Sequence, residues 1–521
     1  MLRCPAGKGM RTIAWGCLVL VGVAMACGET SHKGKPTLPA GGDGGAGEPE
    51  GGSGGVDGLA GGGSTAGVGE AGAPIAAGAG GEGLEALPGY GATFIEPLPA
   101  PTDVPETVEP TDVTTFSVEV SHVSADGSLI VGVSRATFSR PNGPFVYVGQ
   151  ELFSWTEDTG TERLPVTAFQ MACLADDGSA AIFGEELVVR WVPGAGVTPL
   201  PLPAGIKLAS MSSCNGAATQ ASFIDYAAAP YFWHQDHDDN EIVPVAVPMG
   251  GMRGNLLLSR DSERGALTQL DDTMNRIYGW SEVEGPTPID LPAKQLCDVA
   301  KVSGDGAVLA GSCSAGAVTR EFLVRAGSLE LLEPGAGVDA ISRDGHIVWG
   351  HLDDKPNLAP RKLAYWLDDG PMVTVPITTG KVADATFIGG ADDGHVAFVT
   401  TYTQIQEFES RPGRWTVEGG LEPLPLPPGE TDAFLSAVSA DGSLVIGSKV
   451  ADDLQPGAPI LWDEQGPRDI RQELEDAHVD LRGATALSVD HVWPRGSSIR
   501  LLGSATFADG PRAVLLELPQ R

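Results

Sequence analysis

The sequence has no long apolar segment and is poor in cysteine, in aromatic residues and in positive charge. Its longest apolar run, Ile13 to Val23, is too short for a comfortable transmembrane helix. Lys and Arg number 33 against 68 Asp and Glu, so the formal net charge is −35. Such an acidic surface repels phosphate backbones, which argues against nucleic acid as a partner. Seven cysteines are too few for a disulfide-dense scaffold, so each must be interpreted by its position.

The first 26 residues have the features of a secretory signal peptide. Arg3, Lys8 and Arg11 precede the apolar run, and the segment ends Ala24-Met25-Ala26-Cys27. One interpretation is an ordinary small-x-small cleavage site. In the other, the stretch resembles a bacterial lipobox, which implies that Cys27 is acylated and becomes the first mature residue.

Counting the cysteines favours the lipoprotein. Removal of the signal deletes Cys4 and Cys17, and lipidation of Cys27 leaves four cysteines, an even number for an oxidising compartment. The resemblance implies a multiply acylated anchor in the membrane. Gly28 after the cysteine resembles the outer-membrane pattern. We therefore expect residues 1–26 to be a lipoprotein signal peptide and the protein to lie at the outer membrane or cell surface, with secretion as the alternative.

Residues 27–91 are predicted to be a disordered, Gly-rich tether. The segment contains stretches such as Gly51-Gly52-Ser53-Gly54-Gly55 and cannot bury enough apolar surface to offset its backbone entropy. A flexible chain of roughly 60 residues reaches on the order of 40–50 Å. The tether would hold a folded head away from a membrane.

The remainder of the chain repeats one unit. An Asp-Gly turn between two apolar runs predicts a β-hairpin, and a short strand with Trp and a strand ending near Pro follow it. The turns are Asp126-Gly127, Asp177-Gly178, Asp305-Gly306, Asp344-Gly345, Asp393-Gly394 and Asp441-Gly442, with degenerate copies near Thr219, Ser262 and Asp490. The later positions are Trp155, Trp191, Trp233, Trp280, Leu323, Trp366, Trp415, Trp462 and Leu515.

Four short strands per period indicate an all-β fold, a β-propeller of about eight to nine blades over residues 92–521. We count nine units, although seven or eight blades with an irregular excursion also fit. The ninth unit lacks a fourth strand of its own. Residues 92–98 resemble such a strand, and we expect them to pair with residues 512–518 and close the ring.

The units resemble the bacterial extracellular HAF repeats. The resemblance rests on the Ser-x-Asp-Gly-Ser turn, the Val/Ile-Val/Ile-Gly that follows and the later Trp, and it extends through Arg468-Asp469-Ile470 to Ala513–Pro519. It implies a secreted or surface-exposed protein with a β-propeller-like fold. It implies no catalytic activity and no site residues.

The cysteines and tryptophans of the repeat are assigned structural roles. Cys297 and Cys313 stand eight residues either side of Asp305, which places them opposite each other in a hairpin. Cys173 and Cys214 occupy matching positions in successive units, which makes a bridge between blades plausible. One Trp per unit predicts packing between blades and not a sugar-binding row.

The turns and loops contain polar residues that are candidates for metal or ligand binding. Each Asp-Gly turn offers too few oxygens for Ca²⁺, so its Asp is interpreted as a turn residue. The loop from His234 to Glu241 contains metal-ligating residue types, but a solvated acidic loop is the favoured interpretation, and no metal or cofactor is assigned. The longer loops on the opposite face suit binding better. The candidates there are Arg140, Tyr147, Asp353, Asp354, Tyr402, Glu407 and Arg411.

The function predicted is a monomeric cell-envelope lipoprotein that presents a propeller as a binding or scaffold module for an unknown protein or glycan. The alternative is a propeller enzyme, a hydrolase or lyase of extracellular glycans. A third interpretation is an envelope or adhesion component without a small ligand. No nucleophile elbow, phosphate-binding loop or dinucleotide fingerprint occurs, which favours a protein that is not an enzyme.

Overall fold

The computed structural model describes residues 85–101, 105, 108, 113–140, 145–166, 172–184, 188–235, 241–246, 253–261, 263–270, 275–292, 295–316, 318–353, 361–375, 382–403, 409–450 and 456–521. All of them belong to one unit of the chain. The predicted signal peptide, Cys27 and most of the predicted tether lie outside the described residues.

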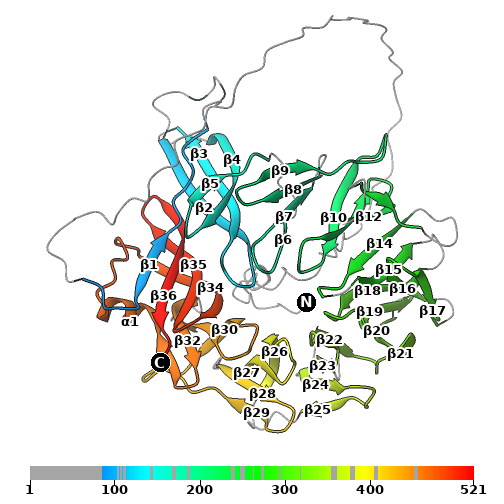
Figure 1. Ribbon diagram of the computed structural model, residues 1–521. Helices are drawn as coiled ribbons and strands as arrows, with labels where there is room; N and C mark the ends of the chain where they lie inside the picture. Colours follow the sequence, from blue (N-terminus) through cyan, green and yellow to red (C-terminus); the bar gives the residue numbers. More distant parts are fainter. Residues whose placement is uncertain are drawn as a thin grey trace, which may run out of the picture. The chain divides into compact units, whose positions relative to one another are not determined.

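Nine four-stranded antiparallel sheets form the nine blades of a β-propeller. They follow one another in chain order around a ring, and the first strand of each of blades 1 to 8 lies nearest the centre (Figure 1). In these eight blades the four strands, here named A to D from the centre outward, are consecutive in sequence. The prediction of an all-β propeller of eight to nine blades is confirmed, and the number is nine.

The strands have the following bounds. Blades 1 to 3 contain β2 (Val113–Val123), β3 (Ile130–Ser139), β4 (Phe145–Thr156) and β5 (Gly160–Arg163); β6 (Ala172–Leu174), β7 (Ala181–Gly184), β8 (Val188–Val192) and β9 (Gly196–Pro199); and β10 (Leu208–Cys214), β11 (Gln220–Asp225), β12 (Pro230–His234) and β13 (Val243–Pro244). Blades 4 to 6 contain β14 (Arg253–Leu258), β15 (Arg264–Leu270), β16 (Arg276–Ser281) and β17 (Gly285–Ile289); β18 (Leu296–Val302), β19 (Val308–Ala315), β20 (Val318–Arg325) and β21 (Ser328–Leu331); and β22 (Ala336–Ile341), β23 (Ile347–Asp353), β24 (Arg361–Leu367) and β25 (Val373–Val375).

Blades 7 to 9 complete the ring. They contain β26 (Val382–Gly390), β27 (Val396–Thr403), β28 (Ser410–Thr416) and β29 (Gly420–Pro423); β30 (Ala433–Val438), β31 (Val445–Val450), β32 (Pro456–Asp463) and β33 (Gly466–Asp469); and β34 (Ala486–Arg495), β35 (Ser498–Phe507), β36 (Gly510–Pro519) and β1 (Gly91–Phe94). The helix α1 (Ile470–Asp476) lies between blades 8 and 9 in the sequence.

The ring is closed by pairing of the two ends of the propeller. β1 runs antiparallel to β36, with Gly91 opposite Glu517 and Phe94 opposite Val514. The N–H of Ile95 extends this ladder by donating to the carbonyl of Ala513 at 2.9 Å. The pairing joins the two segments that the sequence predicts to pair, although it begins one residue earlier, at Gly91, and β1 supplies the D strand that blade 9 lacks (Figure 1).

The Asp-Gly turns between strands A and B are held by a repeated set of hydrogen bonds. In blade 8 the Ser439 hydroxyl and the Ser443 N–H both donate to one Asp441 carboxylate oxygen, at 2.6 and 3.0 Å. The Leu444 N–H donates to the Ser439 hydroxyl at 3.0 Å. Burial alone would raise the pKa of Asp441, but these donors outweigh it and hold the pKa below its ordinary value. Asp is therefore a turn residue, because its oxygen closes the hairpin.

The glycine that ends the Val/Ile-Val/Ile-Gly motif of the repeat has a steric explanation. Strand A carries a register shift in seven blades, between Val120 and His122 in blade 1 and at matching positions in blades 3 and 5 to 9. In five of these blades a strand-A carbonyl lies against a strand-B glycine, and an added Cβ at Gly447 would lie 1.9 Å from the Phe434 oxygen. A side chain at such a glycine would collide with the backbone of its own blade, whereas blades 3 and 7 carry Phe223 and Val399 at the equivalent position.

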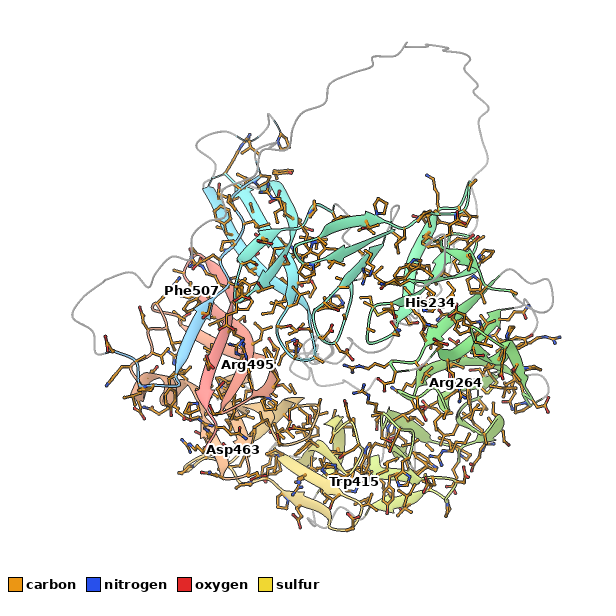
Figure 2. All side chains as sticks on the ribbon, viewed as in Figure 1. His234, Arg264, Trp415, Asp463, Arg495 and Phe507 are labelled. Carbon is orange, nitrogen blue, oxygen red and sulfur yellow. A yellow bond between two sulfur atoms is a disulfide. The ribbon has the colours of Figure 1, made fainter. Side chains whose placement is uncertain are left out.

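The core consists of apolar layers between neighbouring blades. The Trp and Leu of the repeat all lie in strand C and are at most 7% exposed, and Trp415 is fully buried (Figure 2). This confirms that the aromatic series packs between blades. Trp349 and Trp415 of blades 6 and 7 meet edge to face at 4.3 Å between ring centroids.

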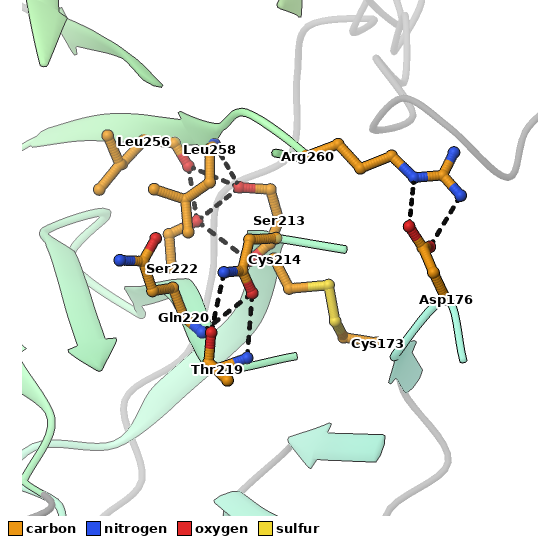
Figure 3. Close-up of a disulfide and its surroundings, with 11 residues drawn as sticks. Cys173, Asp176, Ser213, Cys214, Thr219, Gln220, Ser222, Leu256, Leu258 and Arg260 are labelled. Carbon is orange, nitrogen blue, oxygen red and sulfur yellow. Dashed lines mark hydrogen bonds and ion pairs between the residues drawn. A yellow bond between two sulfur atoms is a disulfide. The ribbon is translucent and has the colours of Figure 1, made fainter. Parts of the chain in front are cut away.

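Both predicted disulfides form. Cys297 and Cys313 are opposite each other in β18 and β19, as the register predicts. Cys173 and Cys214 join blades 2 and 3, with their Cα atoms 6.2 Å apart (Figure 3). Two disulfides are typical of an extracellular or periplasmic protein. Within the ranges described above, none of the helical structure is long and apolar enough to cross a membrane.

One predicted turn is wrong. Asp490 lies inside β34 and not in a turn, because the hairpin of blade 9 continues to Gly496. The extra length carries Trp493 onto the neighbouring blade 1. An added Cβ at Gly127, whose φ is 68°, would lie 1.9 Å from the Trp493 ring. The indole of Trp493 therefore packs on the Asp126-Gly127 turn and forms part of the contact between blade 9 and blade 1.

Candidate functional site at the hairpin-turn face

The residues predicted for ligand binding lie on blades 1, 6 and 7. Tyr147 packs against Phe138, with 5.8 Å between the ring centroids, and Tyr402 packs against Phe434 at 6.4 Å. Tyr402 is opposite Ser410, and the next residue, Arg411, is opposite Thr401. Neighbouring residues of a strand point to opposite faces, so Tyr402 and Arg411 do not share a face of blade 7.

The other members of the set are placed as follows. Arg140 directly follows β3 of blade 1 and Asp353 ends β23 of blade 6, whereas Asp354 and Glu407 lie outside the described residues. Blade 1 is not adjacent to blades 6 and 7 in the ring. The described members of the set are therefore separate points near the ends of strands B and C, and the role of the set in binding stays a prediction.

The acidic loop after His234 is described only at its ends, because residues 236–240 lie outside the described residues. Over the described part of the chain, no group of three or more His, Cys, Asp or Glu side chains is arranged to hold a metal ion. Any binding site in the described residues must therefore include side chains of other types.

The face with the Asp-Gly turns carries a chain of backbone hydrogen bonds from blade to blade. In each, an N–H of one A–B turn donates to the carbonyl of the residue preceding the Asp position in the next blade. The bonds are Asp126 to Asp176 (3.2 Å), Asp176 to Gly216 (2.7 Å), Gly216 to Arg260 (2.7 Å), Asp261 to Gly304 (2.8 Å), Asp305 to Arg343 (3.1 Å), Arg343 to Asp392 (2.7 Å) and Asp392 to Ala440 (2.7 Å). They tie blades 1 to 8 together at the turns.

Charged side chains on this chain pair across alternate blades. Arg260 of blade 4 donates two hydrogen bonds, of 2.9 and 2.7 Å, to Asp176 of blade 2 (Figure 3). Arg343 of blade 6 makes the same forked contact with Asp261 of blade 4. Arg343 also lies 3.5 Å from Asp392 of blade 7. Five charged side chains from four blades thus form ion pairs, which we call the turn-face ion-pair network.

Glycines of the intervening blades leave room for these pairs. An added Cβ at Gly216 of blade 3 would lie 2.5 Å from an Asp176 carboxylate oxygen. One at Gly304 of blade 5 would lie 2.5 Å from side-chain atoms of both Asp261 and Arg343. The residue before the Asp position is therefore glycine in blades 3 and 5, because the ion pair between the flanking blades passes over it.

The network is electrostatically self-contained. The hydrogen bonds to Asp176 raise the pKa of Arg260, and Asp392 of blade 7 contributes to the same shift. The hydrogen bond to Asp261 likewise raises the pKa of Arg343, which Asp176 of blade 2 also favours. Each guanidinium is thus held charged by aspartates on both sides. Paired charges of this kind hold blades together and are not poised to transfer protons.

We expect the Asp176→Ala substitution to lower the free energy of unfolding by about 1 kcal/mol at low salt, because its ion pair is half-exposed and forked. The loss should shrink between about 20 mM and about 1 M NaCl as the pair is screened. Urea unfolding at the two salt concentrations measures it. Glu151→Ala, which breaks the Arg163 pair within blade 1, is the control and should cost less. An equal loss at both salt concentrations would contradict the ionic interpretation.

A second group of titratable side chains lies between blades 5 and 6. The Val338 N–H of β22 donates to a Glu321 carboxylate oxygen of β20 at 2.7 Å. His351 Nδ1 lies 2.9 Å from Asp339 Oδ2. Burial raises the pKa of Glu321, and the Val338 N–H, His351 and Lys301 offset only part of that effect. This carboxyl therefore binds its proton more tightly in the folded chain than in the unfolded chain.

Glu321→Gln should make the stability of the protein less dependent on pH. A carboxyl whose pKa is raised by folding stabilises the fold below its unfolded pKa, and this contribution is lost as pH rises through the folded pKa. The variant should therefore lose less stability than the wild type between about pH 5 and about pH 8. Urea unfolding across that range tests this, with the exposed Glu330→Gln of the same blade as the control. Parallel curves for wild type and Glu321→Gln would contradict it.

Other perturbed groups lie on the innermost strands. Burial raises the pKa of Asp298 on β18 and of Asp490 on β34, and lowers the pKa of His122 on β2 and of His491 on β34. These strands belong to blades 5, 9 and 1. The innermost strands of blades 5 and 9 therefore each carry a carboxyl group whose pKa is raised by burial.

Sequence analysis missed the turn-face ion-pair network because it assigned the turns a purely structural role. The turn Asp does have that role, but the residue before it differs from blade to blade. In blades 1 to 8 it is Ala125, Asp176, Gly216, Arg260, Gly304, Arg343, Asp392 and Ala440. The signal in the sequence was that the residue before the turn Asp is charged or glycine in several blades, although the rest of the motif is uniform.

No known protein family and no curated protein matches the chain. Among solved structures it is similar to a eukaryotic initiation factor, at 11% identity over 70% of this chain and 89% of that one, with a TM-score of 0.44. It is also similar to dipeptidyl peptidase 4 from Porphyromonas gingivalis, at 11% identity over 75% and 65%, with a TM-score of 0.44.

An oligogalacturonate lyase from Vibrio parahaemolyticus is similar as well, at 12% identity over 78% of this chain and 98% of that one, with a TM-score of 0.36. At such low identity and TM-score nothing about activity follows from these likenesses. The chain is a propeller module by its own sheet topology.

Proposed function

We propose that the protein is a cell-envelope lipoprotein whose propeller is a binding or scaffold module. The observation that carries the proposal is that the charged groups gathered from several blades at the turn face are paired with one another. Such groups stabilise a rigid ring and leave binding to the variable loops at the opposite end of the blades, such as the blade 7 loop that Tyr402 and Arg411 flank. We propose that the repeats are of the HAF type.

The anchor of the proposed lipoprotein is Cys27. Two disulfides in the propeller agree with export to an oxidising compartment. The partners proposed are the membrane, through the acylated cysteine, and an envelope protein or glycan bound by the monomeric head. Nucleic acid is not proposed, because of the net charge of −35.

Fractionation of a bacterial host tests the anchor. Wild-type protein should sediment with membranes, and globomycin should block its processing, whereas Cys27→Ser should appear in the soluble fraction. Cys17→Ser, a substitution within the segment expected to be removed, is the control and should leave the distribution unchanged. Membrane association of Cys27→Ser at the wild-type level would overturn the anchor.

Capture from envelope extracts tests the binding face. The immobilised propeller should retain a ligand that Tyr402→Ala or Arg411→Ala releases, because these residues flank the loop between strands β27 and β28 of blade 7. Arg163→Ala, which removes an exposed arginine from strand D of blade 1, should retain it. Retention that is equal in all variants would exclude these two residues from the binding face.

An enzyme acting on extracellular glycans is the second candidate. It is favoured by Asp298 on the inner strand β18, because burial raises the pKa of this carboxyl above its ordinary value, the direction of shift that a general acid needs. If the protein cleaves polysaccharides, Asp298→Asn should abolish the release of reducing ends. Cleavage that is unchanged in this variant would exclude Asp298 as the acid.

A further inference from the structure

Three side chains of different chemistry meet where blades 3 and 4 touch. Gln220 of β11 and His234 of β12 are directly opposite each other in the sheet of blade 3. Glu282, which directly follows β16 of blade 4, has its two carboxylate oxygens 3.1 and 2.9 Å from His234 Nδ1. Figure 2 labels His234 on blade 3, and Figure 3 shows Gln220 on the same blade beside the disulfide. We call these residues the blade 3–4 triad.

Gln220 has an unsatisfied acceptor. The residue is 1% exposed, and its Nε2 lies 3.4 Å from a Glu282 oxygen, so the amide end is at the His234–Glu282 pair. Its Oε1 is buried and has no hydrogen-bond partner. An unpaired buried acceptor costs about 1–3 kcal/mol, a cost that an ordered water, an ion or a ligand can offset.

We propose that Gln220, His234 and Glu282 bind a divalent transition-metal ion, with Zn²⁺ as the best match. Imidazole nitrogen and carboxylate oxygen are the donors that Zn²⁺ takes in proteins, and an amide oxygen completes three protein ligands. Nε2 and not Oε1 of Gln220 faces Glu282, so the amide oxygen reaches the ion after a half-turn of the amide. The half-turn exchanges O and N with almost no change of shape, and the bond from the oxygen to the ion replaces the Nε2–Glu282 hydrogen bond.

The spacing of the triad fits one ion. Donors about 2.0–2.2 Å from a metal lie about 3.0–3.5 Å from each other. The His234–Glu282 and Gln220–Glu282 separations of 2.9 and 3.4 Å span nearly that range. The side chains of His234 and Glu282 are only 14% and 21% exposed, so water competes little for the site.

The surroundings favour a cation. The net charge of −35 raises the local concentration of cations. Because Glu282 belongs to blade 4 and the other two residues to blade 3, the ion cross-links neighbouring blades. Its binding should therefore stabilise the fold as well as give heat.

Titration of the full propeller with Zn²⁺ alone tests the proposal, by calorimetry and by the melting temperature. One equivalent should bind, and the melting temperature should rise. His234→Ala and Gln220→Met should each raise the dissociation constant for Zn²⁺ at least tenfold and abolish the rise in melting temperature. Gln220→Met retains the volume of the side chain and removes only the amide, so it serves if His234→Ala fails to fold.

The matched control is His346→Ala. His346 Nδ1 lies 2.5 Å from Asp368 in blade 6, which makes a His–carboxylate pair of the same kind but with half-exposed side chains. This variant should bind Zn²⁺ as the wild type does. Binding that survives in Gln220→Met and His234→Ala, or that is lost only in His237→Ala of the acidic loop, would overturn the proposal.

Discussion

Replacing Arg468 by alanine should lower the free energy of unfolding by about 3–5 kcal/mol, because it leaves buried carboxylates without their cation. Its side chain is 0% exposed, and it donates to both Glu473 oxygens at 2.8 and 2.5 Å. Asp463 lies 3.3 Å away, and the Pro519 carbonyl accepts from the same guanidinium at 3.1 Å. Arg468 thus connects blade 8 and α1 to the C-terminal strand.

The same network holds the N-terminal strand. The Tyr90 hydroxyl, immediately before β1, donates to Glu473 at 2.8 Å. Burial alone would raise the pKa of Glu473, but the hydrogen bonds from Arg468 and Tyr90 outweigh it and hold the pKa below its ordinary value. Ile470 and Leu474 of α1 belong to one apolar cluster with Phe94 of β1. The loss of Arg468 therefore weakens ring closure at both of its ends.

Urea unfolding of Arg468→Ala measures the loss, and Arg471→Ala is the control. Arg471 lies on the same helix but pairs with Glu475 at the surface, so its replacement should cost less than about 1 kcal/mol. Equal stability losses for the two variants would show that the buried network contributes no more to the free energy of unfolding than a surface ion pair does. Arg468→Met, which restores packing without the charge, should recover little, because Glu473 stays unpaired.

Gly447→Ala should cost about 2–3 kcal/mol through overpacking. The new Cβ would lie 1.9 Å from the Phe434 carbonyl oxygen of strand A and 3.0 Å from the Trp462 ring of strand C. Relief requires that the inner strand of blade 8 move away from its partner.

Gly279→Ala is the matched control. Gly279 is also a strand glycine, but no atom lies within 4 Å of its added Cβ, so its replacement should be nearly neutral. Thermal melting of the two variants compares them. If Gly447→Ala were as stable as Gly279→Ala, the glycine of the repeat would need another explanation.

Much of the blade could be predicted from the sequence because its determinants are local. Asp441-Gly442 specifies a hairpin through a side-chain oxygen two residues from its donor, and Trp462 is placed by the length of the strands around it. The strand that closes the ring was recognisable because residues 92–98 resemble the D strands of other blades. The Cys297–Cys313 pair followed from hairpin register, and the Cys173–Cys214 bridge was plausible because the two residues occupy matching positions in successive units.

What could not be predicted depends on contacts between distant parts of the chain. Asp176 and Arg260 are 84 residues apart, and only the ring places them together. Blade 9 departs from the repeat because Trp493 must pack on blade 1, a requirement that nothing near Asp490 reveals. The binding-face residues were chosen from loop length, which does not say whether Tyr402 and Arg411 share a face.

Hydrogen exchange of β36 tests most directly the central claim, that β1 closes a nine-blade ring. The account predicts slow exchange of the amides of Ala513, Leu515 and Glu517 in the full chain, because these alternate residues of β36 face β1. Deletion of residues 85–95 should make these amides exchange rapidly, while those of 445–450 in blade 8 stay protected. Unchanged protection of Ala513, Leu515 and Glu517 after the deletion would contradict closure by β1.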